Sequence, residues 1–265
     1  MARRNKLWKF AQLQTFPEYY EPDRLDAPEV ISADGVPRDL RDAWARTHFG
    51  NAHPLTLELA CGRGEYTVAL ARANPGRNFI GVDVKGARIY QGATQARAEG
   101  LGNAAWLRTR IEHIDHVFAV GEVAEVWITF PDPFPGSVNR RLIAPRFWTD
   151  YARLLRPGGR LHLKTDNEGL YAYFDEELRD SPVTTTHFEL VADYPDINAP
   201  AELPHPDLAY ETYYERKHRD LGATIKWLSW ARNEALPPSP FRRGAEAPAP
   251  REAPTPSASP SPPQA

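Results

Sequence analysis

Residues 55–65 read Leu-Thr-Leu-Glu-Leu-Ala-Cys-Gly-Arg-Gly-Glu, an apolar run followed by a glycine-containing turn. The apolar part, 55–59, is short and β-compatible, and a helical pattern follows over 65–73. Gly62 and Gly64 lie between the two, where glycine permits a tight turn and a close approach of the backbone to a ligand. A tight strand-to-helix connection needs glycine even without a ligand, so this spacing alone leaves both interpretations open.

The same alternation of strand-like and helix-like patterns continues through the middle of the chain. Further strands are predicted over residues 78–84, 106–108, 123–130, 160–165, 188–191 and 224–230, and further helices over 86–98 and 145–155. Strands that alternate with helices are typical of βαβ units. We therefore predict an α/β fold with a doubly wound sheet, in which a ligand binds beyond the carboxyl ends of the strands.

Composition divides the 265 residues into three regions. Residues 1–50 are expected to form an N-terminal extension with a little helix, and 51–235 the folded domain. Residues 236–265 are rich in Pro, Ala and Ser, so they bury too little apolar surface to offset their chain entropy and are expected to be disordered. No apolar run approaches the ~20 residues of a membrane helix, and the basic start lacks the apolar core of a signal peptide. We expect a cytoplasmic protein with no membrane contact.

Charge and cysteine content limit the possible partners. The net charge of −3 argues against a general polyanion binder but allows a local basic patch for one nucleic acid. Two candidate clusters are Arg3, Arg4, Lys6 and Lys9, and Arg140, Arg141 and Arg146. Either cluster is equally compatible with a solvated surface. The single cysteine, Cys61, cannot form an intramolecular disulfide or a cysteine zinc site by itself, and no metal is expected.

Two carboxylates limit which kind of ligand the glycine turn can bind. Asp83 ends the second predicted strand, where a carboxylate can accept hydrogen bonds from ribose hydroxyls. The turn lacks the G-x-G-x-x-G order of dinucleotide enzymes, and Glu65 would repel a pyrophosphate at the start of the helix. Glu58 instead suits a ligand with a positive amino group. S-adenosyl-L-methionine carries an ammonium, a sulfonium and no phosphate, so the carboxylates favour it as cofactor.

A second group of polar residues follows later strands. Pro131 and Pro133 stiffen the turn around Asp132 and hold that carboxylate at the carboxyl end of a central strand, although an ordinary strand-ending turn has the same pattern. Arg140 and Arg141 provide cations that can hold phosphates. Two further segments complete the group: Asp166, directly after the strand at 160–165, and the polar and aromatic stretch 212–217, whose plainer interpretation is a sheet edge or a linker.

Together these stretches resemble the bacterial tRNA (guanine-N7-)-methyltransferase family, the TrmB type. The matching stretches are 58–66, 79–83, 130–135, 140–142, 162–166 and 212–217, and the similarity covers roughly residues 50–230. The resemblance implies a Rossmann-like class I S-adenosylmethionine-dependent methyltransferase, with a mostly parallel doubly wound sheet and an antiparallel last strand. It also implies methyl transfer to N7 of a guanine in tRNA, at position 46 of the variable loop, by a monomer or a homodimer.

The resemblance assigns roles to individual residues. Cofactor binding falls to Glu58, Gly62, Gly64, Asp83, Arg110 and Asp132, with Glu58 at the methionine end, Asp83 at the ribose and Arg110 near the adenine. Asp132 is also the expected catalytic residue at the reaction centre. Contacts with the guanine or the tRNA fall to Arg140, Arg141, Asp166, Thr212, Tyr213, Tyr214 and Glu215.

The sequence departs from the family pattern at three points. Ala60 replaces the usual first glycine, and we expect its methyl group to be tolerated only if φ stays negative there. Arg110 stands where Asp or Asn is commoner. The loop after Asp132 is shorter than usual and lacks the lysine expected near Gly136.

The chemistry expected of these residues is simple. Guanine N7 has a lone pair and carries no proton, so it can attack the methyl carbon directly, and positioning is the enzyme's main task. We expect Asp132 and Asp166 to hold the N–H edge of the guanine, with Tyr213, Tyr214 or Phe134 stacked on the base. Three alternatives stay open: a methyltransferase of another substrate, a non-catalytic RNA-binding module, and a dinucleotide oxidoreductase, which the glycine order disfavours.

Overall fold

A computed structural model describes residues 2–24 and 27–234 of the protein. The disordered tail expected over residues 236–265 lies outside the described residues. Within the described part, no helix is both long and apolar enough to cross a membrane.

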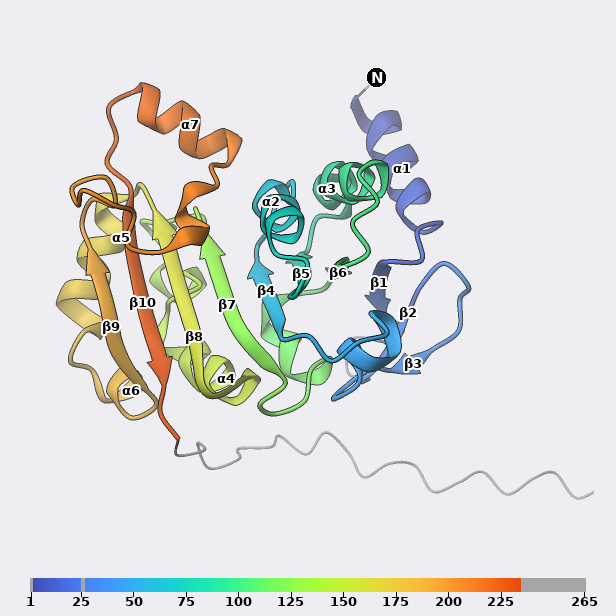
Figure 1. Ribbon diagram of the computed structural model, residues 1–265, viewed down its shortest axis with the longest axis horizontal. Helices are drawn as coiled ribbons and strands as arrows, with labels where there is room; N and C mark the ends of the chain where they lie inside the picture. Colours follow the sequence, from blue (N-terminus) through green and yellow to red (C-terminus); the bar gives the residue numbers. More distant parts are fainter. Residues whose placement is uncertain (1, 25–26, 235–265) are drawn as a thin grey trace, which may run out of the picture.

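A mixed sheet runs through the centre of the molecule (Figure 1). Its strands lie in the order β3-β2-β1-β6-β5-β4-β7-β8-β10-β9. Their bounds are β1 Tyr19–Pro22, β2 Glu29–Ile31, β3 Arg38–Asp39, β4 Leu55–Leu59, β5 Asn78–Asp83, β6 Ala104–Arg108, β7 Val123–Thr129, β8 Leu155–Thr165, β9 Phe188–Tyr194 and β10 Lys226–Arg232. Strands β4 to β8 pair in parallel, whereas β10 is antiparallel to both of its neighbours. The predicted α/β fold with an antiparallel last strand is confirmed.

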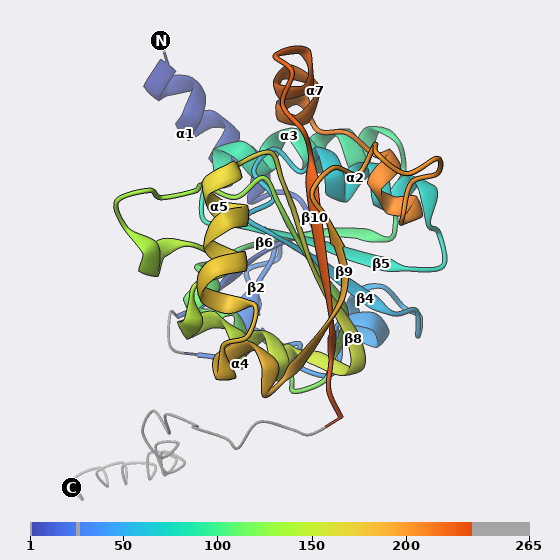
Figure 2. The same ribbon diagram turned by 90° about the vertical axis from the view of Figure 1, so that its left-hand side faces the viewer.

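Helices cover both faces of this sheet (Figures 1 and 2). Their bounds are α1 Ala2–Leu13, α2 Glu65–Ala73, α3 Gly86–Ala98, α4 Pro145–Leu154, α5 Glu168–Tyr173, α6 Pro182–Thr185 and α7 Tyr213–Asp220. Shorter helical turns span Trp44–His48, Ile111–His116, Val138–Arg140, Phe174–Leu178 and Pro206–Ala209. Helices α4 and α5 pack one apolar core against the sheet, and α2 and α3 pack a second core on the other face.

Trp106 of β6 shapes the second core and, through it, the glycine turn. The side chain is fully buried, and a Cβ atom added to Gly64, Gly81 or Gly92 would come within 2.3–2.7 Å of its indole ring. Gly64 therefore has a packing role in addition to its place in the turn after β4.

The first 50 residues contribute strands as well as the expected helix. Strand β1 pairs in parallel with β6, placing Tyr19 opposite Trp106, and β2 and β3 extend the sheet beyond it. Trp44 is fully buried, and its Nε1 donates a hydrogen bond to the carbonyl of Val117 at 3.1 Å. These strands were not predicted from the sequence because segments of two to four residues are too short to show a period.

Candidate functional site

The turn after β4 has a left-handed backbone at alternate residues. Ala60, Gly62 and Gly64 have φ values of 58°, 58° and 70°. The turn is closed by Gly64 N–H, which donates to the Cys61 carbonyl at 2.8 Å. The expectation that φ stays negative at Ala60 is wrong. For a residue with a Cβ atom this conformation costs roughly 1–2 kcal/mol, so the turn is maintained against local strain.

Asp83 is held directly beside this turn. Its Oδ2 accepts a hydrogen bond from Gly62 N–H at 2.9 Å, and its Oδ1 accepts one from Lys85 N–H at 2.7 Å. A carboxylate oxygen has two lone-pair directions, so each oxygen keeps one for a ligand hydroxyl. The geometry fits the ribose role that the resemblance implies.

A cavity of about 410 Å³ opens at the carboxyl ends of β4 to β7. Four of the predicted site residues line it: Asp83, Arg110, Asp132 and Arg140. Its volume lies in the roughly 300–1,000 Å³ range of small-molecule sites. The position is the one expected for a ligand in a doubly wound sheet.

The turn around Asp132 is strained on both sides. Phe130 and Phe134 have φ values of 47° and 40° and line the cavity, as Ala60 does. Within the described ranges, Asp42 is the only other non-glycine residue with a positive φ. Strained backbone concentrates at functional sites, and here it presents the exposed Asp132 side chain to the cavity.

Arg140 and Arg141 point to different surroundings. Arg140 is exposed and lines the cavity, with its guanidinium 4.3 Å from the ring centroid of Phe134. Arg141 is buried, and its Nε donates to the carbonyl of Pro133 at 2.9 Å. The structure therefore places Arg140 where a substrate can reach it and Arg141 as a support of the Asp132 turn.

Glu58 lies beneath the turn after β4. Its Oε2 accepts hydrogen bonds from the backbone N–H of Thr67, at 2.9 Å, and from the Thr67 hydroxyl, and its Oε1 accepts one from the Thr129 hydroxyl at 2.7 Å. Burial raises the pKa of Glu58 to about 7, and the hydrogen bonds from the two threonines oppose that rise. The side chain joins α2 to β4 and β7 and does not line the cavity.

The stretch 212–217 forms the N-cap and the start of helix α7. It is therefore neither a sheet edge nor a linker. The Thr212 hydroxyl accepts a hydrogen bond from Glu215 N–H at 3.1 Å, as an N-cap does. Glu215 is fully buried, with Oε2 2.7 Å from Lys164 Nζ and Oε1 3.0 Å from an Arg219 nitrogen. Burial lowers the pKa of Lys164, and the charge of Glu215 opposes that shift. Both residues of the motif thus hold α7 in place.

Tyr213 and Tyr214 are half exposed and face the glycine turn. The Arg63 guanidinium lies 5.3 Å and 6.0 Å from their ring centroids, and Tyr213 N–H donates to Glu65 Oε2 at 2.5 Å. Helix α7 is therefore connected to the glycine turn as well as to β8. Arg63 and Lys164 were not predicted as connecting residues, although a lysine inside an apolar strand indicates a buried partner.

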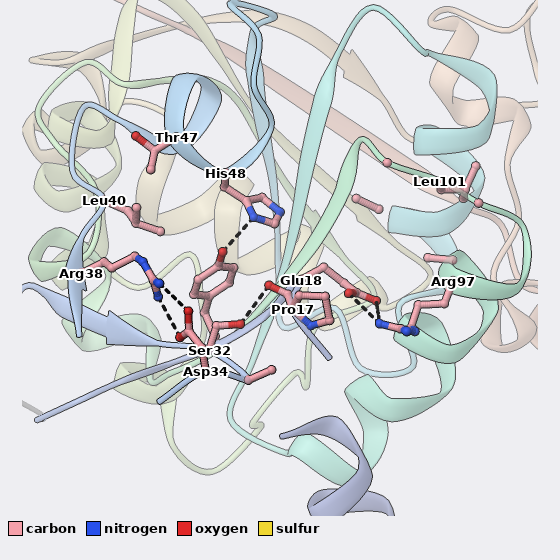
Figure 3. A pocket seen from close by; sticks show the side chains of 16 residues that line it. Pro17, Glu18, Ser32, Asp34, Arg38, Leu40, Thr47, His48, Arg97 and Leu101 are labelled. Atoms are coloured by element: carbon pink, nitrogen blue, oxygen red, sulfur yellow. Dashed lines mark hydrogen bonds and ion pairs between the residues drawn. The ribbon is translucent and has the colours of Figure 1, made fainter. Parts of the chain in front are cut away.

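A larger cavity of about 650 Å³ lies among the N-terminal strands and α3 (Figure 3). Its charged groups pair with one another: Arg38 with Asp34, and Arg97 with Glu18 at 3.0 Å. It is lined by residues that precede β1 and β6, such as Pro17, and therefore opens near the opposite ends of those strands. None of the predicted site residues lines it, so the smaller cavity is the candidate site.

Comparisons with known proteins agree with this geometry. The solved structure of the 16S rRNA methyltransferase KamB matches with a TM-score of 0.56 at 18% identity, covering 75% of this chain and 96% of that chain, and shares its fold. A profile of the family described as "Putative methyltransferase" matches residues 52–228. The fold and the cavity define a Rossmann-like methyltransferase that uses S-adenosyl-L-methionine.

Two curated relatives identify the family more closely. The tRNA (guanine-N(7)-)-methyltransferase of Porphyromonas gingivalis is 46% identical over 224 residues, which are 84% of this chain and 87% of that protein. The enzyme of the same name from Bacteroides thetaiotaomicron is 39% identical over 229 residues, 86% of this chain and 85% of that protein. The chain belongs to the tRNA (guanine-N(7)-)-methyltransferase family, as the motifs predicted.

Proposed function

We propose that the protein transfers the methyl group of S-adenosyl-L-methionine to N7 of a guanine in tRNA, at position 46 of the variable loop. One observation carries the proposal in particular. Asp83 and Asp132 line a single cavity at the carboxyl ends of the central strands, in a chain of this family. A tRNA substrate places the reaction in the cytoplasm, and both a monomer and a homodimer are compatible with it.

The cavity suits S-adenosyl-L-methionine, a cofactor that carries no phosphate. Asp83 has lone pairs for the ribose hydroxyls, and the turn containing Gly62 brings backbone close to the ligand. Arg110 lies on the wall at the position that the family resemblance gives to the adenine. S-adenosyl-L-methionine, when bound, supplies an electrophilic methyl group bonded to a positively charged sulfur.

The side chains act on the guanine mainly by orienting it. N7 uses its lone pair to form the new bond to the methyl carbon, while the electron pair of the broken carbon–sulfur bond stays on sulfur. Because N7 carries no proton, no general base is required. Asp132 and Asp166 accept hydrogen bonds from the N–H edge and offset the positive charge that develops on the base.

The same contacts provide specificity for guanine. Adenine presents a different pattern of donors and acceptors, and a carboxylate that a bound base covers without donating to it loses its contacts with water at a cost. Tyr213 and Tyr214 offer half-exposed rings on which a base can stack. Around the cavity, exposed cations supply contacts for RNA phosphates: Lys85, Arg88, Arg140 and Arg146.

The experiment uses purified full-length protein, isotopically labelled S-adenosyl-L-methionine and an unmodified tRNA transcript. Nuclease digestion and mass spectrometry of the nucleosides should detect labelled 7-methylguanosine. A matched transcript with adenosine at position 46 should receive no label. Label in another nucleoside, or equal label in both transcripts, would contradict the proposal.

A further inference from the structure

Helix α1, which carries the first basic cluster of the sequence, projects from the fold at its amino end. Its carboxyl end is fixed by Leu13, which is fully buried, whereas Leu7 and Trp8 are 65% and 52% exposed. The amino end of α1 rises past the carboxyl ends of the central strands, and α7 lies on the same side of the molecule (Figures 1 and 2). The first turns of α1 therefore stand at the edge of the sheet where the candidate cavity opens.

Helix α1 is joined to the wall of the cavity through the start of α3. Phe10 packs on Gly86, where an added Cβ atom would come within 2.9 Å of the Phe10 ring. On either side of Gly86 in the sequence, Lys85 and Arg88 are exposed and line the cavity. The basic residues of α1 thus lie on a helix that packs directly against the cavity wall.

The cations of this region lack acidic partners. Neither α1 nor α3 contains an aspartate or a glutamate. Glu18 and Glu21, which follow α1, are already paired with Arg97 and Arg108 at 3.0 Å and 2.7 Å. Within residues 2–24 and 27–234, four cations form no ion pair and make up, with Trp8, what we name the α1 surface: Lys6, Lys9, Lys85 and Arg88. In a protein with a net charge of −3, such a local concentration of positive charge attracts a polyanion.

The chemistry of the α1 surface fits RNA better than a lipid surface. Trp8 contacts Tyr90 of α3 edge-on, with ring centroids 5.6 Å apart, and remains half exposed. An exposed aromatic ring beside cations is the combination that binds unpaired bases and their phosphates. Binding in a membrane interface requires a wide apolar face, whereas the large apolar side chains that α1 exposes within its described part are only Leu7 and Trp8.

We infer that the α1 surface binds the tRNA beside the target guanine, with Lys6 and Lys9 paired to phosphates and Trp8 stacked on a base. This inference rests on the proposed function, which places the guanine in the cavity that Lys85 and Arg88 line. These contacts are made in the ground state and in the transition state alike. The α1 surface should therefore affect the KM for tRNA and leave kcat unchanged.

The test measures tRNA binding at several salt concentrations for wild type and for the double variant Lys6→Gln, Lys9→Gln. Each phosphate contact contributes about 0.9 to the slope of log affinity against log salt, so the variant should lose about 1–2 from that slope and bind roughly tenfold more weakly at ~0.1 M salt. The matched control is Arg46→Gln, Arg156→Gln, which removes two exposed cations that do not line the cavity. The control should stay within about twofold of wild type.

Two further readouts separate the roles of charge, stacking and folding. Trp8→Ala should weaken tRNA binding roughly fivefold or more but keep the salt slope of wild type, because stacking on a base releases no counterions. In the lysine variant, the dissociation constant of S-adenosylhomocysteine and kcat at saturating tRNA should equal those of wild type, which shows that the fold and the site are intact.

Several outcomes would overturn the inference while wild type still makes 7-methylguanosine. They are an unchanged affinity and salt slope in the lysine variant, an equal loss of affinity in the arginine control, and an unchanged affinity in Trp8→Ala. Binding to vesicles of phosphatidylcholine and phosphatidylserine that the lysine variant loses, with tRNA binding intact, would assign the α1 surface to a membrane instead. Absence of 7-methylguanosine from the wild-type reaction would overturn the proposed function, and the inference with it.

Discussion

Glu58 and Glu215 are buried, whereas Asp132 lines the cavity and Asp166 is partly exposed after the end of β8. All four carboxylates belong to motifs that the family resemblance assigns to ligand contacts. The two glutamates are 4% and 0% exposed, and neighbouring side chains and N–H groups engage their oxygens. Asp132 is exposed, and Asp166 is partly so. Such a motif therefore contains residues that can contact the substrate and residues that support the fold. The burial of each side chain and its hydrogen-bond or ion-pair partners distinguish the two kinds.

Breaking the buried ion pair should have the largest effect on stability. Lys164→Ala leaves Glu215 without its nearest cation in a fully buried position, and we expect the free energy of unfolding to fall by about 3–5 kcal/mol. Urea unfolding followed by circular dichroism measures this change. The double variant Lys164→Met, Glu215→Leu removes both charges and should recover most of the loss. A single variant within about 1 kcal/mol of wild type would disprove the supporting role of the pair.

Glu58 should make stability depend on pH. Its pKa is raised to about 7 in the folded protein from 4.5, so the folded state binds the proton more tightly. The resulting stabilisation is complete below pH 4.5 and is lost as the pH rises through about 7. Glu58→Gln has no such proton, so relative to wild type it should gain up to about 3 kcal/mol between pH 5 and pH 8.

Denaturant unfolding of wild type and Glu58→Gln at several pH values measures that difference directly. Glutamine can still accept from Thr67 and donate to the Thr129 hydroxyl, so the pattern of hydrogen bonds is preserved. Other titrating groups are common to both proteins and cancel. A difference that is constant from pH 5 to pH 8 would rule out a raised pKa at Glu58.

Asp132 should affect catalysis without affecting stability. Asp132→Asn keeps the shape of the turn but removes the charge, and we expect kcat/KM for tRNA to fall about a hundredfold. The free energy of unfolding should change by less than about 0.5 kcal/mol because the side chain is exposed. Asp180→Asn, also exposed but outside the cavity, is the matched control. Equal kcat/KM values for Asp132→Asn and the control would remove Asp132 from the reaction centre.

Ala60 should give the smallest effect, and in the opposite direction. Its φ of 58° favours glycine, so Ala60→Gly should raise the free energy of unfolding by about 1 kcal/mol. In the α2 helix, by contrast, Ala69→Gly should lower it by about 0.5–1 kcal/mol. Thermal unfolding of the two variants in parallel shows whether each substitution raises or lowers the stability. A destabilised Ala60→Gly protein would show that the turn relaxes its strain by other means.

Long elements with a strong period were predictable from the sequence. The strand at 55–59 and the helices at 65–73 and 86–98 have the bounds that the patterns indicated, because each carries its own apolar face. Strand β1 pairs with β6, which lies far along the chain, while β2 pairs with β1 and β3 with β2, and these short strands show no local pattern. Helix α7 was missed because its apolar face is small and its stability comes from Thr212 and from the buried Glu215.

Part of the cavity lining was predictable from the sequence, but which carboxylates are buried was not. Parallel strands end at one edge, and this rule brought Asp83 and Asp132 to the same cavity. Whether a carboxylate is buried depends on distant partners, as Thr67 and Thr129 are for Glu58. The sign of φ at Ala60 depends on the path of the whole turn, which the residue type alone did not reveal.

The most direct test of the central claim is nucleoside analysis of tRNA from a strain that lacks this gene. We predict that 7-methylguanosine is absent from position 46, returns with the wild-type gene, and stays absent or strongly reduced with Asp132→Asn expressed at an equal level. Persistence of 7-methylguanosine in the deletion strain, or full restoration by Asp132→Asn, would contradict the account.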